Sequence, residues 1–117
     1  MCGPRLCQAG DALVGDGFIG PQYQGYSVSL SSAGSLLAVG GPFTQNGTGA
    51  VWMWENNGTK WNQMGGALLG TGFIGVYLFQ GYSVSLSSNG SILAVGSPGN
   101  NDGIGAVCLF NRTSEYV

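Results

Sequence analysis

The sequence contains no histidine and very little charge. Three basic residues stand against five acidic ones, and charged residues make up only 7% of the chain. Binding to nucleic acid or to an anionic membrane surface needs clustered Lys and Arg, which this chain lacks. Without histidine it also lacks the commonest general base and metal ligand, and no nucleophile lies beside a base. We therefore expect no enzymatic activity, no catalytic residues and no nucleic-acid partner.

Long apolar runs and helical periodicity are missing as well. No stretch approaches the roughly 20 apolar residues that a transmembrane helix needs, so we expect no membrane insertion. No apolar segment follows the first residues as it would in a signal peptide, so if the protein is secreted we expect the chain to be already processed or part of something longer. Apolar residues nevertheless make up 44% of the sequence, which predicts a packed fold rather than disorder.

Glycine is abundant, with 23 residues, and it recurs at fixed places within an internal repeat. Residues 25–54 align without gaps on residues 81–110 with 19 identities in 30 positions, at an offset of 56. Upstream, residues 12–20 match residues 67–75 at 7 of 9 positions, at an offset of 55. Such similarity over almost the whole chain indicates a repeat architecture.

Each repeat has the periodicity of short strands joined by turns. In the first strand, Tyr26, Val28 and Leu30 alternate with serines, which predicts a half-buried strand. A loop rich in Gly, Pro and Asn follows the second strand, and Asn56–Gly58 is expected to form a hairpin turn. The four strands expected in the first repeat are Tyr26–Leu30, Leu36–Val39, Ala50–Trp54 and Trp61–Met64. Four antiparallel strands in about 55 residues are the unit of a β-propeller blade, so the fold class is all-β with two tandem propeller-type blades.

The two ends of the chain are out of step with the repeat. Residues 5–10 occupy the place that residues 60–65 fill in the first repeat. The division is therefore a leading strand at 1–10, a first blade at 11–65, and a second blade at 66–117 that lacks its fourth strand. Known propellers have about four to eight blades, so strand exchange with neighbouring copies or further repeats must complete this fold. The strand expected to add to a neighbour comprises Arg5, Leu6, Cys7, Gln8 and Ala9.

The segment Gly81–Pro98 resembles FG-GAP repeats, which build the propeller of integrin α chains. Gly40-Gly41-Pro42 and Gly96-Ser97-Pro98 are similar to the "GAP" element, and Gly25-Tyr26 and Gly81-Tyr82 to the "FG" region in altered order. The resemblance covers both repeats and implies a propeller fold in an extracellular setting. It implies little about function, because the family includes proteins of adhesion, scaffolding and other roles.

One family feature is missing from the sequence. Many FG-GAP repeats carry an Asp-rich calcium loop after the first strand, but the matching stretches here, 31–35 and 87–91, contain no carboxylate. Calcium binds through several carboxylate oxygens, so we expect neither calcium nor any other metal or cofactor. Asp11 and Asp16 form no catalytic pair either, because the second repeat has Gly66 and Thr71 in their places.

Four acceptor sequons for N-glycosylation lie in or beside predicted turns. The asparagines are Asn46, Asn57, Asn89 and Asn111. They are not equivalent positions of the repeat, since Asn46 aligns with Asp102 and Asn57 with Thr113, so duplication did not copy one site. The alternative interpretation is that Asn-Gly followed by Ser or Thr serves only as turn chemistry.

The odd number of cysteines suggests a bond between chains or a free thiol. If the leading strand of one copy pairs with the last strand of another, Cys7 and Cys108 could form a disulfide across subunits. Alternatively, Cys2 takes the place of Cys7 or closes a small loop with it. In a further alternative, Cys108 is a buried apolar residue that replaces Trp52.

These features favour a secreted or cell-surface structural glycoprotein whose two-blade units associate head to tail into a filament or ring. The expected partners are copies of the same chain. The alternative is a fragment of a larger extracellular propeller that binds a protein or glycan ligand in adhesion or recognition. Aromatic side chains suit such binding, although they also fill the space between blades.

We expect protein from a eukaryotic source to carry N-linked glycans on at least one of the four asparagines. Enzymatic removal of N-glycans converts each modified asparagine to aspartate, and peptide mass spectrometry then locates it. Chains with all four asparagines unmodified would contradict the glycoprotein hypothesis.

Overall fold

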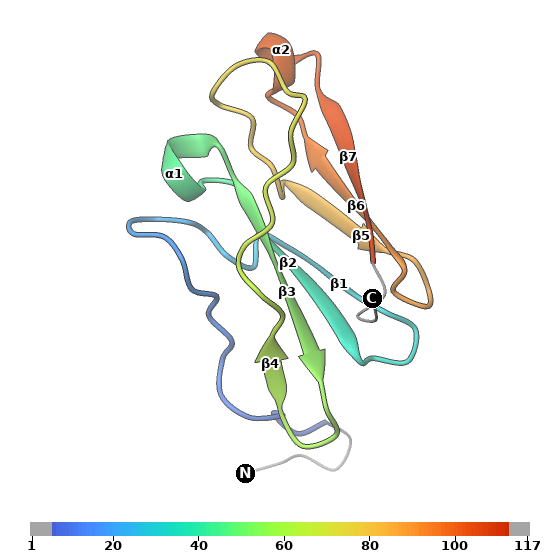
Figure 1. The fold of residues 1–117 in the computed structure, drawn as a ribbon. Helices are drawn as coiled ribbons and strands as arrows, with labels where there is room; N and C mark the ends of the chain where they lie inside the picture. The colour runs from blue at the N-terminus through green and yellow to red at the C-terminus, as the bar shows by residue number, and fades with distance from the viewer. Residues whose placement is uncertain (1–5, 113–117) are drawn as a thin grey trace.

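The computed structural model describes residues 6–112, and they form two antiparallel sheets that pack face to face (Figure 1). The first sheet has the order β1-β2-β3-β4 and the second the order β5-β6-β7. In the first sheet the strands are β1 (Ser27–Leu30), β2 (Leu36–Gly41), β3 (Ala50–Asn56) and β4 (Trp61–Gln63). In the second they are β5 (Ser83–Leu86), β6 (Ile92–Ser97) and β7 (Ala106–Asn111). The predicted all-β class and antiparallel pairing are thus confirmed.

The long glycine-rich loops differ from the prediction. Each second strand continues two residues further than expected, and a single helical turn then leads to the third strand. These turns are α1 (Thr44–Gly47) and α2 (Asn100–Gly103). Gln45 and Asn46 in α1, like Asn101 and Asp102 in α2, have positive φ between 51° and 57°. Asn and Asp tolerate this left-handed region better than most residues, which is consistent with their use here.

The hairpin between β3 and β4 has a four-residue loop at 57–60, longer than the sequence pattern predicts. The Asn57 side chain holds it together, because its Oδ1 accepts hydrogen bonds from the backbone N–H groups of Thr59 at 3.0 Å and Lys60 at 3.1 Å. Such bonds from an asparagine side chain to the backbone two or three residues on mimic a backbone turn. Trp61 therefore lies opposite Asn56, and Asn62 lies opposite Glu55.

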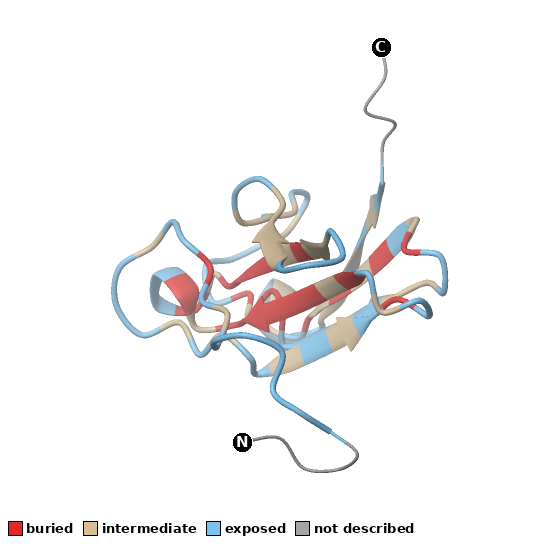
Figure 2. Ribbon diagram, turned by 90° about the horizontal axis from the view of Figure 1, so that it is seen from below, coloured by how far each residue is buried: buried red, intermediate tan, exposed pale blue. Residues whose placement is uncertain are grey.

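One hydrophobic cluster lies between the sheets. Ala38 and Val51 of the first sheet meet Leu93 and Val95 of the second, and all four are almost completely buried. The buried strands run through the centre of the molecule (Figure 2). Around this cluster pack five partly buried side chains, Met53, Leu68, Val84, Leu86 and Phe110. Burial of apolar area at about 25 cal/mol per Å² makes this contact the main force that holds the sheets together.

A second cluster covers the opposite face of the first sheet. Ala50, Trp52 and Trp54 of β3 pack there under the segment that precedes β1, which contributes Leu13 and Phe18. Trp52 is fully buried, and its indole N–H donates a 2.9 Å hydrogen bond to the Asp16 carbonyl. The segment therefore covers this face of the first sheet at β3, whereas Val28 and Leu30 of β1, on the same face, remain exposed. In Figure 1 the blue segment lies along the side of this sheet that faces away from the second.

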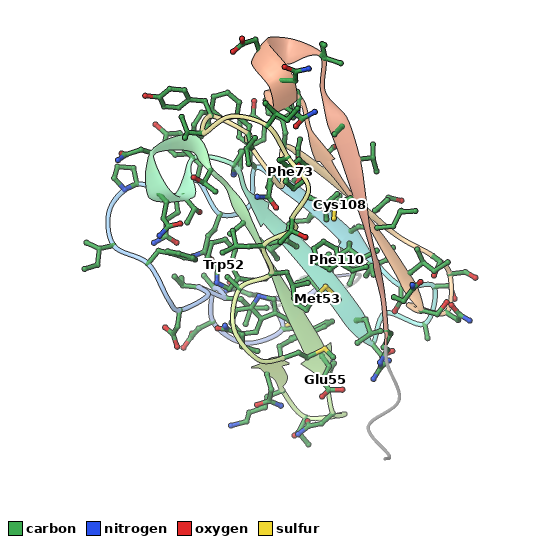
Figure 3. All side chains as sticks on the ribbon, turned by 45° about the horizontal axis from the view of Figure 1, so that its top comes forward. Trp52, Met53, Glu55, Phe73, Cys108 and Phe110 are labelled. Atoms are coloured by element: carbon green, nitrogen blue, oxygen red, sulfur yellow. The ribbon has the colours of Figure 1, made fainter. Side chains whose placement is uncertain are left out.

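The second repeat fills the position of Trp52 with Cys108, and its neighbours change accordingly (Figure 3). In the first repeat Gly41 lies against the Trp52 ring, so a Cβ there would come within 2.8 Å of a ring carbon. In the second repeat Ser97 occupies the place of Gly41 and is buried. The smaller cysteine leaves room for the serine side chain, which explains this paired difference between the repeats.

The β1 and β5 strands face each other through serine hydroxyl groups. Ser27 Oγ donates to the Gly81 carbonyl at 2.8 Å, and Ser29 Oγ accepts from the Leu86 N–H at 3.0 Å. Val28 and Leu30 point to the opposite face of the first sheet and are 61% and 57% exposed. The strand β1 is therefore half-buried, as its sequence pattern predicts, and its serine side is the one that the second sheet covers.

Glycine at position 40 permits the closest approach of the two sheets. A Cβ added to Gly40 would overlap the backbone carbonyl oxygen of Gly81. At Gly96, the equivalent position of the second repeat, the added Cβ would meet only the Ser83 hydroxyl group. A serine hydroxyl group also lies beside Gly40, so the two positions differ chiefly in the backbone of a neighbouring sheet.

We expect Gly40→Ala to lower the free energy of unfolding by about 1–3 kcal/mol, since backbone must move to admit the methyl group. The matched variant Gly96→Ala should change it by about 0.5 kcal/mol or less. Urea denaturation of both variants in dilute solution measures the difference. Equal destabilisation by the two substitutions would contradict this account of the sheet contact.

Candidate functional site

The outer edge of β7 has no neighbouring strand among residues 6–112. In the first sheet the equivalent edge, that of β3, is paired with β4 and then with Leu68, whose backbone bridges to Val51. The repeat therefore fills this edge in one sheet and leaves it open in the other. An open edge presents unpaired N–H and C=O groups that can pair with another strand.

An apolar pocket of about 280 Å³ lies between the sheets beside this edge. Met53 and Met64 line it from the first repeat, and Leu68, Leu93, Phe110 and Arg112 line it from the second. Met53 and Phe110, on facing strands, are labelled in Figure 3. In the first repeat the corresponding space is occupied by Trp61 of β4, which packs against the second cluster. The pocket thus marks the place of a missing fourth-strand side chain.

The leading segment is the counterpart of β4 in sequence, but it forms no strand over its described residues. Leu6, Cys7, Gln8 and Ala9 are all exposed, and Leu6 retains 88% of its accessible surface. Arg5 and Cys2 lie outside the described residues. The edge of β3, which precedes the equivalent segment in the first repeat, is already occupied by β4.

The register of β4 predicts how the leading segment would lie on β7. Transferred by the repeat, Leu6 would stand opposite Arg112, and Cys7 opposite Asn111. Trp61 and Gln63 point to the same face as Trp54, so Leu6 would point to the same face as Phe110, toward the pocket. A leucine side chain fits the apolar lining of this pocket.

This register does not bring Cys7 opposite Cys108. Phe110 would face Gln8, so the two cysteines would be three residues apart along the strands, or about 10 Å. A disulfide needs Cα atoms within about 7 Å. In the structure Cys7 is already in a disulfide bond, whereas Cys108 is a free thiol. Cys108 is half-buried against Gly70, in the position of Trp52.

All four sequon asparagines are exposed. Asn57 and Asn89 lie in turns, and their Oδ1 atoms accept hydrogen bonds from the backbone two residues on, at 3.0 Å in both cases. Asn46 lies in α1 with a positive φ. Asn111 is the last residue of β7. Each position is accessible to a modifying enzyme, although exposure also suits the turn interpretation.

A group of aromatic rings lies near α1 and the starts of β1 and β5. Phe43 makes edge contacts with Tyr23, Tyr26 and Phe79, at ring-centre distances between 4.8 and 5.9 Å. Tyr26 also contacts Tyr82 at 4.9 Å, and a side-chain hydrogen bond with Tyr82 raises the pKa of Tyr26 above its ordinary value. A shallow pocket of about 320 Å³ opens beside Phe43 and Phe79.

No group of three or more metal-binding side chains gathers within residues 6–112. Asp11 and Asp16 are exposed, and the hydrogen bonds of Asp16 to Gln63 and Trp52 are made by its backbone. No helix in this part of the chain is long and apolar enough to cross a membrane.

No protein-family model matches this chain, and no curated protein is similar to it in sequence. The resemblance to FG-GAP repeats therefore depends on the motifs alone.

Proposed function

We propose that this chain is a non-enzymatic, secreted structural glycoprotein whose two-blade, FG-GAP-like units join head to tail into a filament or ring. The observation that carries the proposal is the open edge of β7 beside an apolar pocket. An exposed leading segment takes the place that the fourth strand has in the first repeat. Strand addition between copies satisfies both, because it pairs the β7 backbone and buries Leu6.

Several further features support association over catalysis. The exposed faces carry few charges, so repulsion between copies is small. Exposed asparagine sequons fit a secreted protein, and Cys7 is in a disulfide, which is typical of oxidising compartments. A contact in which one copy offers a strand and the next offers an edge is heterologous, so it produces rings or filaments.

A second candidate is a ligand-binding module, a fragment of a larger extracellular propeller that recognises a protein or glycan. The specific observation in its favour is the exposed aromatic group around Phe43 and Tyr26, since aromatic rings are enriched at recognition sites. Binding of isolated chains to a glycan library, lost in Tyr26→Ala, would favour this candidate over self-association.

We expect the wild-type chain to associate as its concentration rises, and Leu6→Asp to weaken this association at least tenfold. A carboxylate cannot enter the apolar pocket without losing its hydration. The matched control is Ile19→Asp, which puts the same charge on an equally exposed apolar residue far from the strand register. Sedimentation velocity measures all three proteins.

A wild-type chain that stays monomeric at high concentration would contradict the proposal. Equal weakening by Leu6→Asp and Ile19→Asp would contradict the role of the leading strand.

A further inference from the structure

Within the chain, the two sheets meet through different faces. The first sheet contributes the face that carries Ser27, Ser29, Val51 and Met53, which we call its back. The second sheet contributes the opposite face, which carries Val84, Leu86, Leu93 and Val95 and which we call its front. The back of the second sheet and the front of the first have the same positions of the repeat but no partner sheet among residues 6–112.

On the back of the second sheet, apolar residues stand where the first sheet has its core. Val107 and Leu109 are equivalent to Val51 and Met53 of the internal contact. Val51 is 1% exposed, whereas Val107 and Leu109 are 67% and 64% exposed. Val84 and Leu86, which pack against the same buried cluster from the second sheet, have exposed equivalents of their own, namely Val28 and Leu30 on the front of the first sheet.

The serines that make the polar contacts also have exposed equivalents in the second sheet. Inside the chain, Ser27 and Ser29 bond to the backbone of the segment 81–86. Their equivalents Ser83 and Ser85 are exposed. The internal contact also includes a backbone bond of 2.8 Å from Ser32 to Ser88 and a bridge between Gly49 and Gln80.

The backbone that would enter such a contact is already in the required conformation. Phe79, whose N–H donates to the Gly47 carbonyl at 2.7 Å across the internal contact, has a positive φ of 57°. Tyr23, its equivalent, has a φ of 59° although it is exposed. Gly25 and Gly81 likewise share a positive φ, but space around Gly25 is open, whereas Gly81 is closely surrounded.

We propose that a second copy of this chain packs the front of its first sheet on the back of the second sheet, repeating the internal contact. The second copy's Gly25 carbonyl then lies over Gly96 and accepts from the Ser83 hydroxyl group. The second copy's Val28 and Leu30 then pack against the back of the second sheet, the face that carries Val107 and Leu109. This inference deepens the proposed function and rests on it, and it adds a face-to-face contact to the strand addition.

The strand addition and the face contact are compatible because both follow from one operation. In the chain, the segment after β4 bridges to Val51 through Leu68 and then continues to the second sheet. The second copy's leading segment would follow the same course along β7, with its Leu13 beside Val107. The same displacement, applied repeatedly, therefore generates every contact between copies.

Two double variants test the faces separately. Val107→Lys with Leu109→Lys spoils the back of the second sheet, and Val28→Lys with Leu30→Lys spoils the front of the first. All four residues are exposed, so each single chain should fold. The matched control is Ile19→Lys with Ile74→Lys, which adds the same charge at exposed loop positions.

We expect the wild type and the control to form large assemblies, and each face variant alone to stay monomeric in sedimentation velocity. An equimolar mixture of the two face variants should form a one-to-one dimer and nothing larger, because one intact front meets one intact back. Assembly of either variant alone, or no dimer in the mixture, would overturn the face contact. If the wild type associates while the face variants also associate, only this inference fails, whereas a monomeric wild type contradicts the proposed function itself.

Gly96→Ala provides a second test that leaves the single chain intact. The added methyl group meets only a serine hydroxyl group in the chain, but it would collide with the second copy's Gly25 carbonyl. We expect normal unfolding behaviour and association weakened at least tenfold. Unchanged association of Gly96→Ala would contradict the repeated contact.

Discussion

The close approach of the backbone at Gly81 to Gly40 determines how the two sheets pack. Neither position can carry a Cβ without collision, so the sheets come together at a point where side chains are missing. Serine hydroxyl groups and the apolar cluster around Val51 then complete the contact on both sides of this point. A rigid arrangement follows, because the glycines remove the freedom to repack that longer side chains would allow.

The same contact explains why the strand pattern was predictable and the covered side of β1 was not. Alternation of Val28 and Leu30 with serines identified the strand correctly, since period two is a local property. Which side of β1 is covered depends on what packs there, and in the single chain Val28 and Leu30 are exposed to solvent. Val28 is exposed because no sheet among residues 6–112 packs on that side of β1, so the local pattern itself is correct.

Loop geometry was the other part that the sequence left open. The length of the loop between β3 and β4 depends on the hydrogen bonds that Asn57 Oδ1 accepts from the backbone N–H groups of Thr59 and Lys60. Several turn types fit the same Asn-Asn-Gly residues. The register that follows from it places Cys7 away from Cys108, which spacing alone could not decide. By contrast, the edge of β7 that stays open among residues 6–112 could be inferred from the phase of the repeat, because an offset of 55 or 56 residues holds along the chain.

The proposed contact, which joins the front of one copy to the back of the next, would give an assembly of copies a direction. Its two ends expose different surfaces, so they can grow at different rates and be capped independently. Asn111 lies on the back of the second sheet, in line with Val107 and Leu109. A chain that carries a glycan there would join a growing polymer through its front and then stop further addition, as a chain terminator does. The fraction of chains modified at Asn111 would in that way regulate polymer length.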